Sequence, residues 1–398
     1  MKTWEEYEDK LEYGRDFLST SCSNLYKYID AISGQFWSCK KLLSYGRPFN
    51  FVLSGRSVGK STQVACLVLL DYIVNHRRFI YMRRDKDTIQ ETALTFFANA
   101  CEILNSVMPE FIPGFFIAIK LVGKFYYVAM AKDPETGELF FDDQSCGQTV
   151  ALSLERKSKS SALGDIYNII FDEFIERDPT KYLGSAETMD VIEYRAVMSL
   201  YHTVDRRVGR VFRNETRVWF LGNTETKFCP LLLKLGIADY MTTGAHFIAP
   251  KGKQWVLEQV RGIDALKGRE QSFAYQLSTE DEMKYSFSSD VEEDKAFVST
   301  PDVAEYIMTW RLEGKDYGLM VDVRDVMRPL HITSKARTGY QTLSLDNGSH
   351  TGIDFQLIRS WRQQPMIKRA AEFYERGLLT FDKEETKRTF LKYFQFVI

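Results

Sequence analysis

The sequence is poor in the residues that build metal centres and disulfide frameworks. Its 398 residues include only five histidines and six cysteines, and no two cysteines form a Cys-x-x-Cys pair. Structural zinc sites need such ligands at short spacing, and disulfide frameworks need a dense cysteine pattern. We therefore expect neither, and the scattered thiols favour a reducing compartment.

Long apolar runs and a strong excess of charge are missing as well. No apolar stretch approaches the roughly 20 residues of a membrane-spanning helix, and the longest, residues 64–74, contains Asp71. The first residues lack the basic and then apolar order of a signal peptide. Lysine and arginine total 52 against 54 acidic residues, for a net charge of −2. The sequence thus predicts a cytosolic protein without membrane contact, which can meet nucleic acid only through local basic patches.

Strand-like and helix-like apolar segments alternate between residues 49 and 221. The expected strands are 49–53, 78–83, 167–171 and 217–221, and the expected helices are 60–75, 88–107 and 187–204. Residues 115–150 read as further strands with a turn at 133–137. Such alternation is typical of an α/β fold whose mostly parallel sheet lies between helices.

A phosphate-binding loop is the most specific motif. Residues 54–61 read Ser-Gly-Arg-Ser-Val-Gly-Lys-Ser, a P-loop with serine in place of its first glycine, between an apolar strand and an apolar helix. Gly55 and Gly59 allow backbone N–H groups to surround phosphates at the positive helix end. Lys60 can reach the β- and γ-phosphates, and the Ser61 hydroxyl can ligate Mg²⁺. The residues expected to contact ATP here are Ser54, Gly55, Arg56, Ser57, Val58, Gly59, Lys60, Ser61 and Thr62.

Polar residues at two other strand ends complete the motif. Asp172 and Glu173 directly follow the strand at 167–171. Asp172 is expected to hold Mg²⁺ through its water shell, and Glu173 to orient and activate the attacking water, which indicates hydrolysis. Asn223 follows the strand at 217–221 and is a candidate γ-phosphate sensor, although Gly-Asn is also an ordinary turn.

Basic residues gather in three segments, 77–84, 156–161 and 206–213. Most of these side chains are expected to form a solvated positive surface. A few could reach a neighbouring subunit's ATP as an arginine finger, or contact the phosphodiester backbone of DNA.

Together these motifs resemble the DNA-encapsidation ATPases of small podophages, which are relatives of the large terminase ATPases of tailed bacteriophages. The similarity extends from about residue 48 to the C-terminus. The segments that carry it are Arg56, Lys159-Ser160-Ser161-Ala162, Phe171-Asp172-Glu173-Phe174-Ile175, Thr203-Val204-x-Arg206, 317–323 and 377–382.

The resemblance implies an ATP-driven motor subunit that works in a homo-oligomeric ring, with five copies expected, and uses ATP and Mg²⁺. The motor would drive double-stranded DNA through the portal into a procapsid, and a packaging RNA is a candidate further partner. The protein would act in the host cytoplasm, attach transiently to the procapsid and be absent from the mature virion. Arg206 matches a finger acting in trans, with Arg207 an adjacent alternative, and Lys159 matches a lysine that reaches the neighbour's nucleotide. The expected catalytic set consists of Lys60, Glu173, Arg206 and Lys159.

Four parts are expected in the chain. They are a helical N-terminal extension (1–47), a P-loop ATPase domain of the ASCE type (48–248), a linker or mobile subdomain (249–294) and an α+β C-terminal domain (295–398). Large terminases carry an RNase H-like nuclease, and the C-terminal domain is expected to be its shortened, inactive relative. Asp322 ends a suitable strand, but Asp346 and Asp354 lie in a Gly/Asn/Ser-rich segment. Two alternatives stay open: a large terminase with an active nuclease, and a nucleotide-binding structural adaptor without turnover.

Overall fold

A computed structural model of the chain shows two compact units. The residues that it describes are 22–34, 36–55, 58–154, 165–176, 182–183, 189–206, 215–223, 229–241, 245–260, 297–301, 303–312, 314–325, 329–344, 355–357 and 365–394. Residues 1–183 and 190–292 make the first unit, and residues 184–189 and 293–398 make the second. None of the helices in these described ranges is long and apolar enough to cross a membrane.

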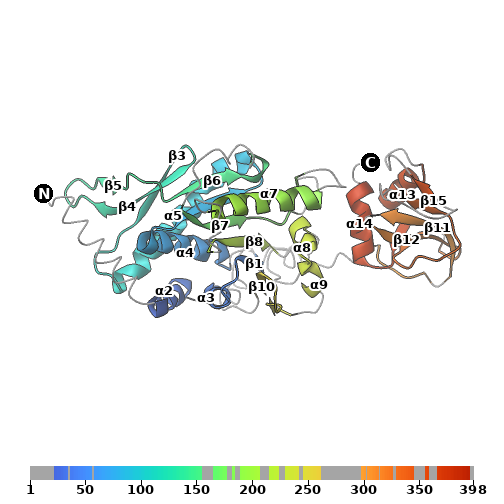
Figure 1. Cartoon of the computed structure of the whole chain (residues 1–398), viewed down its shortest axis with the longest axis horizontal. Coiled ribbons are helices and arrows are strands. Elements are labelled where there is room, and N and C mark those ends of the chain that lie inside the picture. The colour runs from blue at the N-terminus through green and yellow to red at the C-terminus, as the bar shows by residue number, and fades with distance from the viewer. Residues whose placement is uncertain are drawn as a thin grey trace, which may run out of the picture. The chain divides into compact units, whose positions relative to one another are not determined.

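A mixed ten-stranded sheet forms the centre of the first unit (Figure 1). Its parallel strands lie in the order β6 (Gly147–Ala151), β2 (Arg78–Arg83), β7 (Ile166–Asp172), β8 (Arg217–Asn223), β1 (Phe49–Ser54) and β10 (Trp255–Gln259). Its antiparallel edge strands are β3 (Ala118–Val122), β4 (Phe125–Lys132), β5 (Leu139–Phe141) and β9 (Phe247–Ile248). The expected α/β fold with a largely parallel sheet is confirmed.

Helices cover both faces of this sheet. Those on one face are α4 (Lys60–Asn75) and α5 (Lys86–Val107), and they share a core with Val52, Tyr81 and Trp219 of the strands. Side chains alternate along a strand, so the neighbouring Phe51 and Phe220 face the other side. There Tyr201 of α7 (Met189–Asp205) lies 5.0 Å from Phe49, measured between ring centroids. The shorter helices are η1 (Met108–Glu110), η2 (Leu152–Leu154), α8 (Pro230–Lys234) and α9 (Ile237–Met241).

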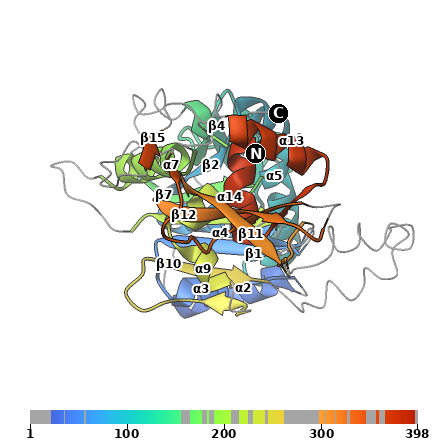
Figure 2. The same ribbon diagram turned by 90° about the vertical axis from the view of Figure 1, so that its right-hand side faces the viewer.

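The N-terminal segment is part of this core. It contains α2 (Cys22–Ser33) and α3 (Lys40–Ser44), and Tyr28, Trp37 and Leu42 are buried in the same cluster as α4 and α5. In both views α3 lies beside β10 (Figures 1 and 2). The described part of this segment is helical, and its apolar side chains complete the core of the first unit.

The expected linker needs a correction at its start. Residues 255–259 form β10, which pairs in parallel with β1 along its whole length. Trp255, Val256 and Leu257 are buried, so this short apolar run completes the sheet although polar and charged residues surround it in the sequence. Residues 261–296 lie outside the described ranges.

The second unit is an α+β domain built on a six-stranded sheet. Its strands lie in the order β15 (Phe355–Leu357), β14 (Thr342–Ser344), β11 (Ala304–Leu312), β12 (Lys315–Asp322), β13 (Leu330–Thr333) and β16 (Leu379–Phe381). The helices α13 (Pro365–Glu375) and α14 (Glu384–Phe394) contribute to its core, where Trp310, Phe381 and Phe390 are buried. Val298 forms an isolated parallel bridge to Phe381, and the Phe381 N–H donates to the Phe297 carbonyl at 2.8 Å.

Candidate nucleotide-binding site

The sheet brings the expected site residues to one edge. β7, β8 and β1 are neighbours and run in parallel, so their carboxyl ends meet at the same edge, where ligands bind in folds of this class. The loop after β1 leads directly into α4. Asp172, Asn223 and the phosphate-binding loop thus converge on the positive end of a buried helix.

Gly59 shapes the end of the phosphate-binding loop. Its φ is 85°, and it immediately precedes Lys60, the first residue of α4. A Cβ at this position would lie 2.8 Å from the Cβ of Phe36. Only glycine fits, because the conformation is left-handed and the aromatic side chain leaves no room. Val58 is buried, and its carbonyl accepts a hydrogen bond from the Trp37 N–H at 3.0 Å.

The polar side chain of Ser54, at the first position of the loop, is accommodated by a hydrogen bond within the loop. The Ser54 side chain is fully buried, and its hydroxyl donates to the Gly55 carbonyl at 2.7 Å. The hydroxyl is thus satisfied within the loop. Thr62 is half-buried in the first turn of α4, whereas Arg56 and Ser57 lie outside the described residues.

The phosphate-directed lysine already has a partner on the neighbouring strand. Lys60 is 8% exposed, and its Nζ donates to Asn223 Oδ1 at 2.8 Å. Asn223 is the last residue of β8 and stands next to Ser54 in the register of the sheet. From the sequence, Asn223 could have been an ordinary turn residue. Its side chain instead lies beside the Lys60 ammonium group, close to where a phosphate bound by Lys60 would lie.

The residues expected to hold Mg²⁺ face each other. Ser61 Oγ lies 3.5 Å from Asp172 Oδ1, and Asp172 is 5% exposed. A hydroxyl and a carboxylate at the start of a P-loop helix suit Mg²⁺, which takes one or two carboxylates together with substrate phosphates and waters. Within the described ranges no group of three or more His, Cys, Asp and Glu side chains could hold a metal ion. The pair of Ser61 and Asp172 oxygens fits a metal that arrives with a nucleotide, because the substrate phosphates would supply further ligands.

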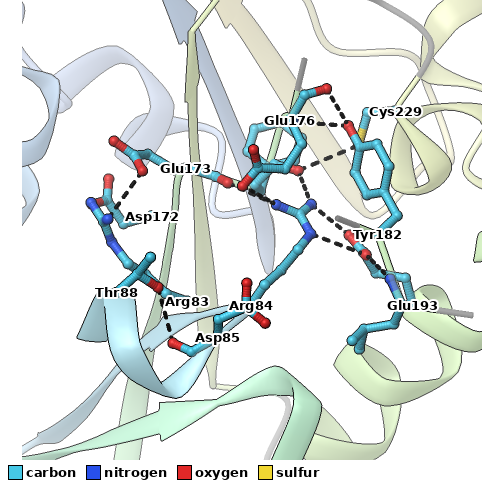
Figure 3. A network of polar contacts seen from close by, with 12 residues as sticks. Arg83, Arg84, Asp85, Thr88, Asp172, Glu173, Glu176, Tyr182, Glu193 and Cys229 are labelled. Carbon is cyan, nitrogen blue, oxygen red and sulfur yellow. Dashed lines mark hydrogen bonds and ion pairs between the residues drawn. The ribbon is translucent and has the colours of Figure 1, made fainter. Parts of the chain in front are cut away.

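Arg83 is a site residue that the sequence placed only in a general basic cluster. Its Nη2 lies 2.7 Å from Asp172 Oδ2 and its Nη1 lies 3.0 Å from Glu173 Oε2 (Figure 3). The Tyr81 hydroxyl also donates to Asp172 Oδ2 at 3.1 Å. Burial raises the pKa of this hydroxyl, so it stays protonated. One guanidinium thus bridges both members of the acidic pair.

Glu173 leaves the strand in an uncommon backbone conformation. Its φ is 53°, and its side chain is 56% exposed, in contrast to the buried Asp172 before it. A left-handed turn is unusual for a residue other than glycine, asparagine or aspartate. It turns the Glu173 carboxylate out of the strand, toward Arg83 (Figure 3).

Arg84, from the same basic segment, pairs with a helix glutamate that the sequence did not single out. Arg84 and Glu193 are both buried and form a pair that lies beside Glu173 (Figure 3). The only local signals were a charged residue following an apolar strand and an acid within an otherwise apolar face of the helix at 187–204. Neither signal names its partner, because the two residues are 109 positions apart.

Of the residues expected to act on a neighbouring subunit, the structure describes Arg206. Arg206 directly follows α7 and is exposed. The aspartate before it, Asp205, is buried and accepts from the Thr216 hydroxyl at 2.8 Å. Lys159 and Arg207 lie outside the described residues.

Of the three aspartates considered for a nuclease site, the structure describes Asp322. Asp322 ends β12, and its Oδ1 accepts the backbone N–H groups of Arg324 at 2.8 Å and Asp325 at 3.1 Å. The carboxylate thereby caps the turn that follows the strand. Asp346 and Asp354 lie outside the described residues.

A parallel sheet with a phosphate-binding loop between β1 and α4, and an acidic pair at the end of a neighbouring strand, defines a P-loop NTPase fold. A family model described as Podovirus DNA encapsidation protein (Gp16) matches residues 33–396. The chain belongs to this family. The match begins before residue 48, where the sequence resemblance was first placed, and so includes part of the N-terminal segment that packs into the core.

Similar proteins come from phages of Bacillus. The DNA packaging proteins of phages PZA and phi29 are each 30% identical over 184 residues, which make up 46% of this chain and 44% of the relative. The chain thus spans less than half the length of these two relatives. The DNA packaging protein of phage B103 is 23% identical over 352 residues, or 86% of this chain and 95% of that protein.

Solved structures of similar fold come from packaging motors. A chain of the bacteriophage phi29 viral genome packaging motor assembly has a TM-score of 0.60 at 19% identity, covering 92% of this chain and 100% of its own. A chain of the phi28 gp11 DNA packaging motor has a TM-score of 0.54 at 16% identity, covering 91% and 97%. At these identities the likeness concerns the fold.

Proposed function

We propose that this chain is the ATP-hydrolysing subunit of a viral motor that packages double-stranded DNA. The observation that carries the proposal is the convergence of Lys60, Ser61, Asp172, Glu173 and Asn223 at one sheet edge. Membership of the encapsidation family supplies the packaging context.

ATP would bind with its phosphates over the loop and the start of α4. Lys60 would contact the β- and γ-phosphates, and Asn223, now 2.8 Å from Lys60, would sense whether the γ-phosphate is present. Ser61 and Asp172 would hold Mg²⁺. When bound, the ion would neutralise charge on the phosphates while the γ-phosphoryl group passes to water and ADP leaves.

Glu173 would act as the general base that takes a proton from the attacking water. In the described arrangement its carboxylate is paired with Arg83 at 3.0 Å. The guanidinium thus occupies Oε2, one of the two oxygens that could accept a proton from the water. Proton transfer to Oε2 therefore requires this contact to open, which would tie catalysis to a rearrangement at the site.

The finer assembly belongs to the same proposal. Arg206 is exposed at the end of α7, where it could reach a neighbour's ATP in a ring, and five copies are expected from the resemblance. Arg207 is the alternative to Arg206 as the finger, and Lys159 would also reach the neighbour's nucleotide. The ring would dock on the portal, with a packaging RNA as a further partner, in the host cytoplasm and only during packaging. The C-terminal unit would be an inactive nuclease relative, a reading supported by the turn-capping role of Asp322.

The test is phosphate release by the full chain, with and without double-stranded DNA, together with ATP affinity. The Glu173→Gln variant should bind ATP with unchanged affinity and hydrolyse it about 10²–10⁴-fold more slowly, because only the proton acceptor is lost. The matched control is Glu135→Gln, in the exposed turn between β4 and β5, which should behave as wild type. Normal turnover by Glu173→Gln would reject the assignment of the base. A wild-type chain that binds ATP without turnover would favour the structural adaptor.

A further inference from the structure

Arg84 is a buried charge that the reaction as proposed does not use. It follows β2, and its side chain is only 2% exposed. Its partner Glu193, on α7, has a side chain with no exposure at all. Two hydrogen bonds join them, from Nη2 to Oε1 at 2.6 Å and from Nε to Oε2 at 3.1 Å. A buried ion pair of this kind is weak grounds for stability, because apolar side chains of similar size often stabilise a core as well.

Arg84 also contacts the Glu176 carboxylate, with 3.4 Å between Nη1 and Oε1, and its other hydrogen bonds go to the backbone beside the proposed base. Nη1 donates to the Glu173 carbonyl at 2.9 Å, and Nη2 also donates to the Phe174 carbonyl (Figure 3). These carbonyls belong to the residue in the left-handed conformation and to the next one. Such a conformation persists only where its surroundings hold it, and the guanidinium supplies part of that restraint.

Arg83 and Arg84 contact different parts of the turn at residues 172–174. Arg83 contacts the carboxylates of Asp172 and Glu173, whereas Arg84 bonds only the main chain of Glu173. Neighbouring residues at a strand end point in opposite directions, which is why one dipeptide reaches both sides of the same turn. Arg84 can therefore set where Glu173 lies without changing the charge around its carboxylate.

The same turn is fixed from the other side by Phe174. Its N–H donates to the Leu221 carbonyl at 3.3 Å. A Cβ on Gly222 would lie 2.7 Å from Cε1 of the Phe174 ring. The Arg84 guanidinium lies over the Tyr182 ring, 4.5 Å from its centroid. The turn is thus held between β8 and the Arg84–Glu193 pair, a supporting arrangement of the kind that keeps catalytic groups in place.

We propose that Arg84, itself oriented by Glu193, is a positioning residue that fixes the backbone of Glu173 for ATP hydrolysis. The inference rests on the proposed role of Glu173 as the base. Lysine at position 84 would keep the positive charge but lack the planar fork that serves Glu193 and two carbonyls together. A displacement of the base by about 1 Å can cost on the order of 100-fold in rate.

The experiment measures kcat, KM and ATP affinity of the full chain bearing Arg84→Lys. We expect kcat to fall about 100-fold, while ATP affinity stays within about twofold, because Lys60 and the loop are untouched. The matched control is Arg78→Lys at the other end of β2, where the side chain bonds Ser145, and its kcat should be unchanged. Glu193→Gln keeps the shape of the partner and should lower kcat in the same direction, which covers the case that Arg84→Lys does not fold.

A double variant separates positioning from general damage. In the Glu173→Gln background, single-turnover hydrolysis should not fall further when Arg84→Lys is added, because the group being positioned is already gone. A full additional loss would overturn the proposal, as would an unchanged kcat or a parallel loss of ATP affinity. Normal turnover by Glu173→Gln alone would instead reject the proposed base, so the two failures are distinguishable.

Discussion

At the scale of single residues, Arg83 forms ion pairs with both members of the acidic pair. Asp172 has a side-chain exposure of 7% and Arg83 one of 11%, so each depends on the other for compensation of its charge. Removing one partner from such a pair leaves an uncompensated buried charge. The metal that accompanies ATP would supply positive charge to the same carboxylate, so it could replace Arg83 as the partner of Asp172 when the nucleotide binds.

Arg83→Ala should lower the free energy of unfolding by about 3 kcal/mol. Arg311→Ala is the control, because its pair with Asp316 has side chains 33% and 35% exposed and should cost less than about 1 kcal/mol. Urea unfolding of both variants without nucleotide makes the comparison. Equal losses would mean that Asp172 is not a charge that needs compensation.

At the scale of elements, the N-terminal segment forms hydrogen bonds with both the phosphate-binding loop and strand β10. Trp37 donates from Nε1 to Glu258 Oε2 of β10 at 3.1 Å and from its backbone to Val58 at 3.0 Å. Burial raises the pKa of Glu258, an effect that the Trp37 hydrogen bond partly opposes. The segment therefore supports the loop that is to hold ATP.

Trp37→Ala should destabilise the first unit by about 3–5 kcal/mol, because it removes a large buried side chain and the partner of Glu258. Tyr45→Ala is the contrast, since Tyr45 is 46% exposed, and a loss within about 1 kcal/mol is expected. Denaturant unfolding measures both. A loss within 1 kcal/mol for Trp37→Ala would show that the segment is not part of the core.

The pairing of β13 with β16 should weaken as the pH falls. Burial lowers the pKa of His331, although Asp382 and Asp322 oppose this, and the ring lies 2.9 Å from the Thr380 hydroxyl. The unfolded chain then binds more protons near pH 6, since an unperturbed histidine titrates at about 6.5. Stability is thus full above that value and is lost as the pH falls from about 6.5 through the lowered folded-state pKa. The protection factors of the β13 and β16 amides, which are corrected for the intrinsic slowing of exchange at lower pH, should fall below about pH 6.5 in the wild type, and His331→Gln should remove this pH dependence.

Local patterns predicted the elements that local residues determine. The apolar runs placed α4 at 60–75 and β2 at 78–83 with the bounds that the structure has. The strands β14, β15 and β16 have three residues each, which is too short for a periodic signal, and they were missed. The Arg84–Glu193 pair could not be predicted for another reason. The two residues are 109 positions apart, and only the packing of distant segments brings their charges together.

The whole molecule combines a P-loop unit that carries every described site residue with a separate α+β unit. The sequence predicted that the loop, the acidic pair and Asn223 lie at strand ends, and the structure has them there; their roles in ATP hydrolysis stay a prediction. Whether the chain works in a ring depends on surfaces that sequence motifs do not encode, apart from the exposed Arg206 at the end of α7.

The most direct test of the account is whether ATP turnover moves the protein along DNA. A labelled third strand bound to linear double-stranded DNA reports such movement, since a translocating protein displaces it. The account predicts ATP-dependent release by the wild-type chain and none by Glu173→Gln. Equal release by both, or DNA-dependent hydrolysis without any release, would contradict the claim that this chain is a DNA-translocating motor.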